Sequence, residues 1–290
     1  MASIPDIPKA PFYRPDGRLL RCEVIAVFPG WERERMLPPG HHRHEFHELL
    51  WMEQGHSRHL VDFREYILGP AEVLFMPRGS IHRFDGGEDC CGGLVLFDDD
   101  FLTSAQAHAL RSFRLFDPLC PSRLCTPTCA STVRLLQEIR QEHAQPTLVG
   151  GSTVLQSLLV AVLHKLEATC LPAEILCLDS AAELNQRFSA LLEAHFREQH
   201  SVGFYATALH CSPRQLAAAI RAARGYSTQQ LILERLLLEA KRYLGYTDHR
   251  VSEIAFLLGF DDPAYFSRLF RLKVGQSAEV FRKQLVEKSM

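Results

Sequence analysis

Three histidines and one glutamate have the residue types and the spacing to bind a ligand together. His42, His44 and Glu48 are separated by even intervals, and His82 follows later in the chain. Residues two or four apart on a β-strand point to one face, so the first three should share a face, with His82 supplied by a partner strand. Imidazoles with a carboxylate suit a divalent transition metal such as iron, manganese, zinc or nickel. The odd offset of His47 predicts that it faces outward.

The segments around these residues have the composition of short β-strands. Between about residues 19 and 101, runs of β-branched, aromatic and aliphatic residues are separated by Pro and Gly, a pattern compatible with an all-β jelly roll. The runs lie at Val24–Phe28, Glu48–Met52, Val73–Met76 and Leu94–Phe97.

Two amphipathic helices are expected next, because apolar residues recur at helical spacing in Thr132–His143 and Thr153–Leu166. Their apolar faces exceed what a small barrel needs to cover it, which predicts a homodimer formed through Val133–Ile139 and Leu155–Leu163.

A break at residues 171–173 ends this part of the chain, and everything beyond it has helical patterning. A length of 290 residues favours about two domains. The predicted fold class is therefore α+β: a β jelly roll with following helices at residues 1–177, for effector sensing and dimerisation, and an all-α domain at residues 178–290.

Charge is divided unevenly between these parts. From residue 183 to the end, 15 Lys and Arg stand against 11 Asp and Glu, whereas the whole chain has a net charge of −2. The C-terminal part is the one suited to approach phosphate. The first twenty residues lack a signal-like apolar run and no stretch reaches the roughly 18 apolar residues of a membrane helix, so we expect a cytoplasmic protein without a membrane partner. Nine cysteines without an export signal favour free thiols.

The C-terminal part contains a repeat displaced by 50 residues. Ser212-Pro213 matches Asp262-Pro263, and Gly225 matches Gly275. Ser and Asp are good N-caps, Pro is favoured at the first helical position, and Gly is favoured where a helix ends. Both copies are therefore expected to contain a capped helix of about three turns.

A shorter helix precedes each capped helix, at Val202–Leu209 and Val251–Leu258, with a tight turn between them. Helix, turn, helix is the arrangement whose second helix enters the major groove of DNA. A long helix at Thr228–Leu244 should join the two helix-turn-helix units. Arg214, Arg221, Arg268, Arg271 and Lys273 fall on the helices that this geometry directs at DNA.

Residues 184 to 285 resemble the AraC/XylS family of transcription regulators. The resemblance rests on the segment from Ser252 to Phe260, on the segment from Pro263 to Phe270, and on Gly275. The family usually has Pro where Ala278 and Thr228 stand. The resemblance covers about a third of the chain and implies sequence-specific binding to double-stranded promoter DNA.

The same resemblance implies which residues face the bases. In the first unit they are Arg214, Ala217 and Ala218, with Gln215 and Arg221 positioned for phosphates. In the second unit they are Pro263, Ala264, Tyr265, Ser267 and Arg268. Arginine can discriminate guanine by about 1–3 kcal/mol, whereas alanine can at best touch a thymine methyl group. The second unit is therefore expected to supply more base recognition than the first.

The N-terminal quartet also resembles a family pattern. His42-x-His44-x3-Glu48-x6-Gly55, followed by Pro77-x-Gly79-x2-His82, resembles the two motifs of the cupin superfamily, including its four metal-ligand positions. Met36 and Ala71 replace two of the usual glycines. The resemblance implies a cupin-like barrel with an effector pocket at the quartet. In regulators of the arabinose type this hairpin is often a pocket wall without metal, so three interpretations stay open: a bound divalent transition metal, a metal-free polar pocket, or a structural histidine cluster.

Two functions from different classes follow from these observations. The first is a ligand-responsive transcription regulator, with a small-molecule or metal effector, promoter DNA and RNA polymerase as candidate partners. The alternative is a metal-dependent cupin enzyme, such as a dioxygenase with an accessory helical domain. The regulator is favoured, because the DNA-binding signature fills a complete domain and the cupin-like part has no further acid, base or substrate motif.

Overall fold

The computed structural model describes residues 21–28, 40–85, 87, 89–110, 113–117, 119, 123–125, 130–147, 149–170 and 180–289. The chain divides into two compact units, one within residues 8–176 and the other within residues 177–290. We call their described parts the barrel domain and the DNA-binding domain. The boundary predicted between residues 177 and 178 lies outside the described residues.

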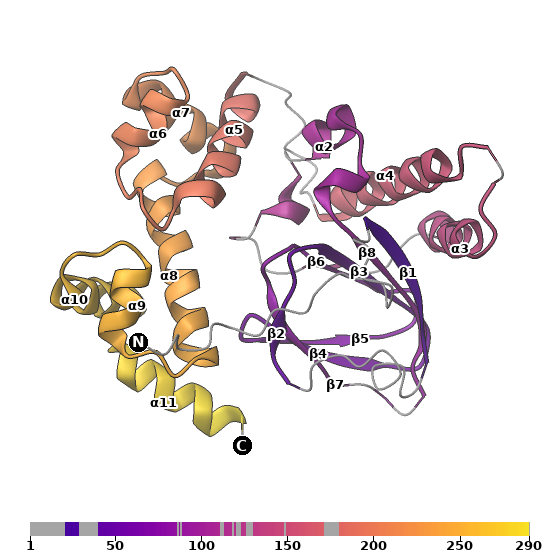
Figure 1. The fold of residues 1–290 in the computed structure, drawn as a ribbon, viewed down its shortest axis with the longest axis horizontal. Coiled ribbons are helices and arrows are strands. Elements are labelled where there is room, and N and C mark those ends of the chain that lie inside the picture. Colours follow the sequence, from indigo (N-terminus) through magenta and orange to yellow (C-terminus); the bar gives the residue numbers. More distant parts are fainter. Residues whose placement is uncertain are drawn as a thin grey trace. The chain divides into compact units, whose positions relative to one another are not determined.

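The barrel domain is built on two antiparallel sheets, as expected for an all-β segment (Figure 1). The five-stranded sheet has the spatial order β1 (Cys22–Val27), β8 (Cys91–Phe97), β3 (His47–Gln54), β6 (Val73–Met76) and β9 (Arg123–Cys125). The four-stranded sheet has the order β2 (His42–Arg43), β7 (Ile81–Asp85), β4 (Ser57–Val61) and β5 (Arg64–Leu68).

Alternation along β3 shows how both faces of the larger sheet are buried. Leu50 and Met52 belong to the apolar core between the two sheets, whereas Leu49 and Trp51 belong to a second core on the outer face. A strand covered on both faces loses the simple alternation of apolar and polar residues, and β3 is accordingly apolar over Leu49–Met52.

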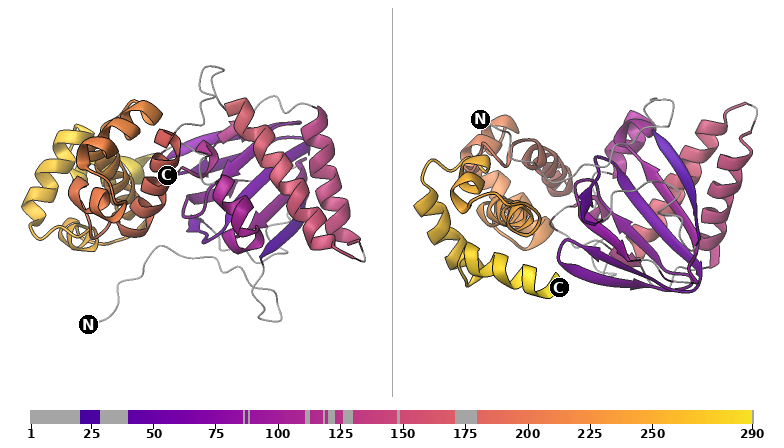
Figure 2. Two further views of the ribbon diagram at one scale, coloured as in Figure 1. Left: turned by 90° about the horizontal axis from the view of Figure 1, so that it is seen from above. Right: turned by 60° about the horizontal axis from the view of Figure 1, so that its bottom comes forward.

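Helices cover the outer face of the five-stranded sheet (Figure 2). These are the predicted α3 (Ala130–Ala144) and α4 (Gly151–Cys170), together with α2 (Ser104–Leu110) and the 3₁₀ turns η1 (Asp99–Phe101) and η2 (Arg114–Phe116). Leu136, Ile139, Leu159, Val162 and Leu163 are all buried in the outer core. The apolar faces that predicted dimerisation are therefore used largely within the chain.

Seven helices form the DNA-binding domain: α5 (Ser180–His195), α6 (Val202–Ala208), α7 (Pro213–Arg224), α8 (Thr228–Tyr246), α9 (Val251–Leu257), α10 (Pro263–Val274) and α11 (Ala278–Ser289). The two predicted helix-turn-helix units are α6 with α7 and α9 with α10, and α8 is the predicted connecting helix (Figure 1). No described helix in either domain is long and apolar enough to cross a membrane.

The predicted caps explain where both recognition helices begin and end. Ser212 Oγ accepts a hydrogen bond from the backbone N–H of Gln215, and an Asp262 carboxylate oxygen accepts one from Ala264. Gly225 and Gly275 end the helices in the left-handed region, with φ of 75° and 83°. Only glycine adopts that conformation without steric cost, so these two positions fix the helix lengths.

Candidate functional sites: the barrel pocket and the DNA-binding surface

The structure brings the predicted quartet together inside the barrel. His42 on β2 lies directly opposite His82 on β7 in the antiparallel ladder. The predicted single strand from His42 to Glu48 is wrong, because residues 44–46 leave the strand before β3 begins at His47. His44 nevertheless turns inward, and its Nε2 lies 2.8 Å from Glu48 Oε1. All four side chains are buried.

Glu48 lies between two imidazoles. Its Oε1 pairs with His44 Nε2, and its Oε2 lies 3.5 Å from His82 Nδ1. Burial raises the pKa of Glu48, but His44 and His82, together with the hydrogen bond from His44, outweigh burial and lower that pKa to about 2. Burial lowers the pKa of His82 to about 3 and also lowers the pKa of His42. At neutral pH the site therefore holds the Glu48 carboxylate, and His42 and His82 are neutral.

The donor set fits a transition metal ion. His42, His44 and His82 each offer one nitrogen, and these nitrogens lie within 4.8 Å of one another. Three buried ring nitrogens, His42 Nε2, His44 Nδ1 and His82 Nε2, have no hydrogen-bond partner among the described residues. Leaving a buried polar atom unsatisfied costs about 1–3 kcal/mol, which a metal ion would relieve.

The pocket beside these histidines is small. Its lining consists of His44, Phe46, Glu48, Met76, Pro77, Ser80 and His82 among the described residues. The empty space of the pocket is about 160 Å³, with open solvent included. Pockets for drug-sized ligands are typically ~300–1,000 Å³. The empty space at this site is smaller than such a pocket.

His47 lies on the outer face of the sheet, as its odd offset predicts, but it is buried there. Its ring packs against Phe97 and Phe116, its Nε2 lies 3.1 Å from an Asp99 oxygen, and its Nδ1 accepts a hydrogen bond from the backbone N–H of Arg78. Burial lowers the pKa of His47. This residue joins the sheet to η1 and η2 and takes no part in the pocket.

Sequence reasoning missed a further imidazole in the barrel interior. His59 on β4 is buried, its Nε2 lies 3.3 Å from Ser57 Oγ, and its ring packs against Phe84. Burial lowers the pKa of His59 to about 4. The alternation of buried Ser57 and His59 with exposed Arg58 is a strand pattern that could have indicated this inward-facing side chain.

The motif glycines differ in how strongly the fold requires them. A Cβ at Gly55, where φ is 66°, would lie 2.3 Å from the Asp89 carbonyl oxygen, so no other residue fits. Ala71, which replaces a usual glycine, adopts a left-handed φ of 62°. The barrel therefore keeps the glycine-like backbone at this turn at the cost of local strain, which is typically ~1–2 kcal/mol for an L-residue.

The first helix-turn-helix unit presents few side chains that could identify a base. Leu216, Ala219 and Ile220 bury one face of α7, while Arg214, Gln215, Ala217, Ala218 and Arg221 are exposed on the other. The side-chain carbonyl of Gln215 accepts a hydrogen bond from the backbone N–H of Ser212, completing a capping box. This cap holds Gln215 at the start of the helix.

The second unit exposes a more varied surface. Ala264, Tyr265, Arg268, Arg271 and Lys273 are exposed on α10, opposite the buried Phe266 and Phe270. Arg268 Nη2 lies 3.5 Å from Asp262 Oδ2. Ser267 is half-buried, and its hydroxyl donates to the Pro263 carbonyl, which reduces its availability to a base.

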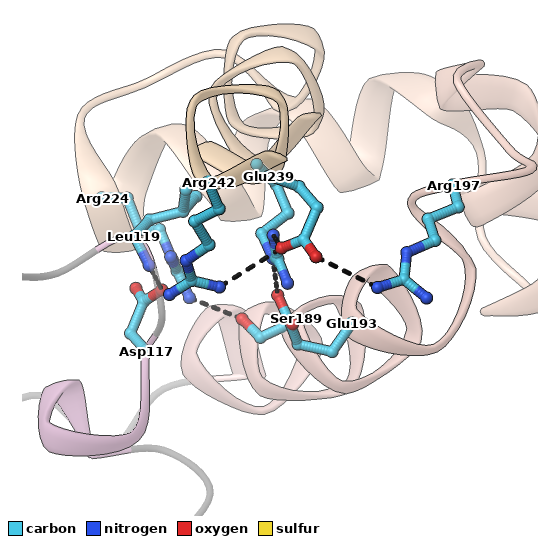
Figure 3. A network of polar contacts seen from close by, with 9 residues as sticks. Asp117, Leu119, Ser189, Glu193, Arg197, Arg224, Glu239 and Arg242 are labelled. Atoms are coloured by element: carbon cyan, nitrogen blue, oxygen red, sulfur yellow. Dashed lines mark hydrogen bonds and ion pairs between the residues drawn. The ribbon is translucent and has the colours of Figure 1, made fainter. Parts of the chain in front are cut away.

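A buried ion network, which the sequence did not reveal, connects α8 to α5 and the segment after it (Figure 3). Glu239 is fully buried and pairs with Arg197, Arg235 and Arg242 at 3.1, 3.2 and 3.3 Å. Arg235 also binds Glu193 at 2.7 Å. These ion pairs hold α5 and the segment after it against the connecting helix α8, which joins the two helix-turn-helix units.

Comparisons with known proteins agree with this two-domain architecture. The family described as "AraC-like ligand binding domain" matches residues 34–159, and the one described as "Helix-turn-helix domain" matches residues 205–284. The transcriptional activator RhaS of Klebsiella pneumoniae is 27% identical over 257 residues, which cover 84% of this chain and 87% of that protein. RhaS of Pectobacterium carotovorum is 25% identical over 279 residues, covering 91% and 94%.

Solved structures of similar proteins include fatty-acid-bound ToxT from Vibrio cholerae, with 14% identity and a TM-score of 0.41, covering 90% of this chain and 94% of that one. The matched families and the curated relatives describe regulators, and the enzyme alternative is set aside on that ground. The chain combines an AraC-like ligand binding domain with a helix-turn-helix domain, and its curated relatives are transcriptional activators; it is an AraC-type transcription regulator.

Proposed function

We propose that the chain controls transcription at promoters that it recognises through both helix-turn-helix units, and that the pocket formed by His42, His44, Glu48 and His82 makes this control dependent on an effector. Two observations carry the proposal, in a domain matched as ligand-binding. His42, His44 and His82 each bring one nitrogen within 4.8 Å of the others, and each also has a buried ring nitrogen without a hydrogen-bond partner among the described residues. DNA contact is assigned to Arg214, Gln215, Arg221, Ala264, Tyr265, Ser267, Arg268, Arg271 and Lys273.

Activation with RNA polymerase as a partner is the mode we propose, because the curated relatives are named transcriptional activators. The chain would work in the cytoplasm, where promoter DNA is accessible. A homodimer remains part of the proposal: Val154 is exposed on α4, and Leu135 and Leu158 are only partly buried, so the outer edges of α3 and α4 are the surfaces offered for it.

The pocket is tested by comparing variants on a promoter that the protein itself selects. Genomic fragments captured by the purified full chain would be placed upstream of a reporter gene. Growth conditions that change expression of the reporter would then be identified with the wild-type protein. His44→Ala and Glu48→Ala are expected to abolish that change, because they remove the convergent polar groups. Both variants should still bind the captured fragment, and residues 178–290 alone should bind it too, because the pocket lies outside these residues.

The matched control is His56→Ala, which removes an exposed imidazole on the same domain and should leave the response intact. If both pocket variants respond like the wild type, the quartet has no sensing role. Capture of no preferred fragments by the full chain would refute the proposed function as a whole.

A further inference from the structure

Three polar residues bind one another where the outer face of the five-stranded sheet meets η1. The backbone N–H of Arg78 donates to His47 Nδ1 at 3.1 Å, and Arg78 Nη1 pairs with Asp99 Oδ2 at 2.9 Å. A backbone N–H can only donate, so in the neutral His47 imidazole the proton lies on Nε2, which donates to Asp99 Oδ1 at 3.1 Å. Each of the three residues is therefore bonded to the other two, and we call them the polar junction.

The turn after β6 connects the polar junction to the pocket. Pro77, which lines the pocket, directly precedes Arg78 in the chain. His82 Nδ1 lies 3.3 Å from Sδ of Met76, the residue before Pro77. Ser80, which also lines the pocket, donates its hydroxyl to the Pro77 carbonyl oxygen at 2.7 Å. A change in the pocket therefore acts on the residues that hold Arg78 in the junction.

On its other side, the polar junction is connected to α4 through η1 and η2. Asp99 lies in η1, and the carbonyl oxygen of Phe101 in the same turn accepts a hydrogen bond from Gln156 on α4 at 2.6 Å. The imidazole of His47 packs against the ring of Phe116 in η2, with the ring centres 4.8 Å apart. A shift of the junction would therefore act on both turns.

A buried carboxylate fixes η2 to α4. The backbone N–H groups of Arg114 and Leu115 donate to Glu167 at 2.9 and 3.2 Å, and Glu167 is buried. Leaving a buried charge without its hydrogen bonds is costly, so we expect η2 and α4 to move together. In chain order, α4 is the last described helix before the DNA-binding domain.

We propose that the polar junction of His47, Arg78 and Asp99 transmits the state of the pocket to α4, and so carries the effector signal toward the end of the barrel domain. The inference rests on the proposed function, because it concerns the regulation exerted by the same pocket. If the junction only stabilised the barrel, pocket and α4 would respond to substitutions independently of each other. Coupling between two sites typically changes an equilibrium by about 5–150-fold.

Hydrogen exchange of the full chain measures this coupling without an effector. His82→Ala removes part of the pocket wall and the contact with Met76, and it should accelerate exchange at the backbone amides of Arg114 and Leu115 by at least about fivefold. In an Asp99→Ala background the same substitution should leave their exchange unchanged, because the junction is already broken. Independent effects would instead add.

Two matched controls are available. Asp100→Ala removes the exposed carboxylate next to Asp99 in η1, and it should preserve the effect of His82→Ala. His59→Gln alters a buried imidazole in the same interior that is not among the residues lining the pocket, and it should leave exchange in η2 unchanged. If Asp99→Ala does not fold, as judged by circular dichroism, Asp99→Asn replaces it, because it removes the charge that pairs with Arg78.

The reporter response provides the second measurement. Asp99→Ala should still bind the captured fragment but should reduce the change in reporter expression at least about fivefold, whereas Asp100→Ala should respond like the wild type.

The inference is overturned by equal acceleration of η2 exchange in the two backgrounds, or by a wild-type reporter response in the Asp99 variant. The exchange measurement needs no DNA, so additive effects in a chain that still selects DNA would remove the coupling and leave the regulator. Lack of DNA selectivity in the wild type would instead remove the regulator itself.

Discussion

Replacing Glu239 with alanine is expected to lower the free energy of unfolding of the DNA-binding domain by about 3–5 kcal/mol, because breaking buried ion pairs by removing their shared partner is strongly destabilising. Glu239 is the acceptor for Arg197, Arg235 and Arg242. Arg235 would keep Glu193 and its position 3.8 Å from the centre of the Phe196 ring, but it would lose its 3.2 Å ion pair with Glu239. Urea unfolding of residues 178–290, followed by circular dichroism, measures the change.

Glu234→Ala on the same helix is the control. Glu234 is only partly buried and accepts a hydrogen bond from Gln230 one turn earlier, an exposed contact typically worth ~0.2–0.5 kcal/mol. If the two variants lose equal stability, the network around Glu239 does not hold the domain together. Specific DNA binding should fall with the folded fraction of Glu239→Ala and should return when stability is restored by lower temperature or by an uncharged osmolyte such as sucrose.

The second large effect is expected at the recognition helices. Arg268→Ala and Arg214→Ala should each lose about 1–3 kcal/mol of discrimination, or roughly 5- to 150-fold, at different base pairs of the preferred duplex. Both guanidinium groups are exposed on the helices directed at DNA. Equilibrium binding to the preferred duplex and to single-base variants, at one salt concentration, measures this loss. In the duplex preferred by the wild type, the half of the site read by the second unit should be more strongly specified than the half read by the first.

Lys273→Ala is the control for a contact to phosphate, since Lys273 is an exposed cation in the last turn of α10. It should weaken binding to all duplexes alike and reduce the slope of log affinity against log salt by about 1. If Arg268→Ala behaves in the same way, Arg268 only contacts phosphate. Equal information in the two halves for the wild type would refute the asymmetry.

Local signals made the DNA-binding domain the more predictable half. A capped helix is specified within a few residues, so Ser212, Asp262, Gly225 and Gly275 fix the limits of α7 and α10 before any tertiary contact is considered. Glu239 shows where such signals stop. On a helix rich in leucine it has the pattern of a solvated charge, and its partner Arg197 lies 42 residues away. Nothing in the local sequence indicates that pairing.

The barrel domain was predictable in its residues but less so in its geometry. The quartet meets as the motif predicts, although the chain leaves the strand at His44 and reaches the pocket by a bend. The outward placement of His47 was predicted, yet its burial depends on η2, which covers the sheet from about 70 residues further along the chain. The apolar faces of α3 and α4 suggested more apolar surface than the barrel needs, because residue spacing alone does not show how much of these faces is buried in the outer core.

The most direct test of the account is selection of duplexes from a fully randomised pool by the purified full-length chain, followed by sequencing. The account predicts enrichment of one motif with two separate elements, one for each recognition helix. The element whose specificity is relaxed in Arg268→Ala should be the more strongly specified of the two, because it is the one read by α10. Retention of the pool without sequence preference, by a folded protein, would contradict the central claim that this chain reads DNA.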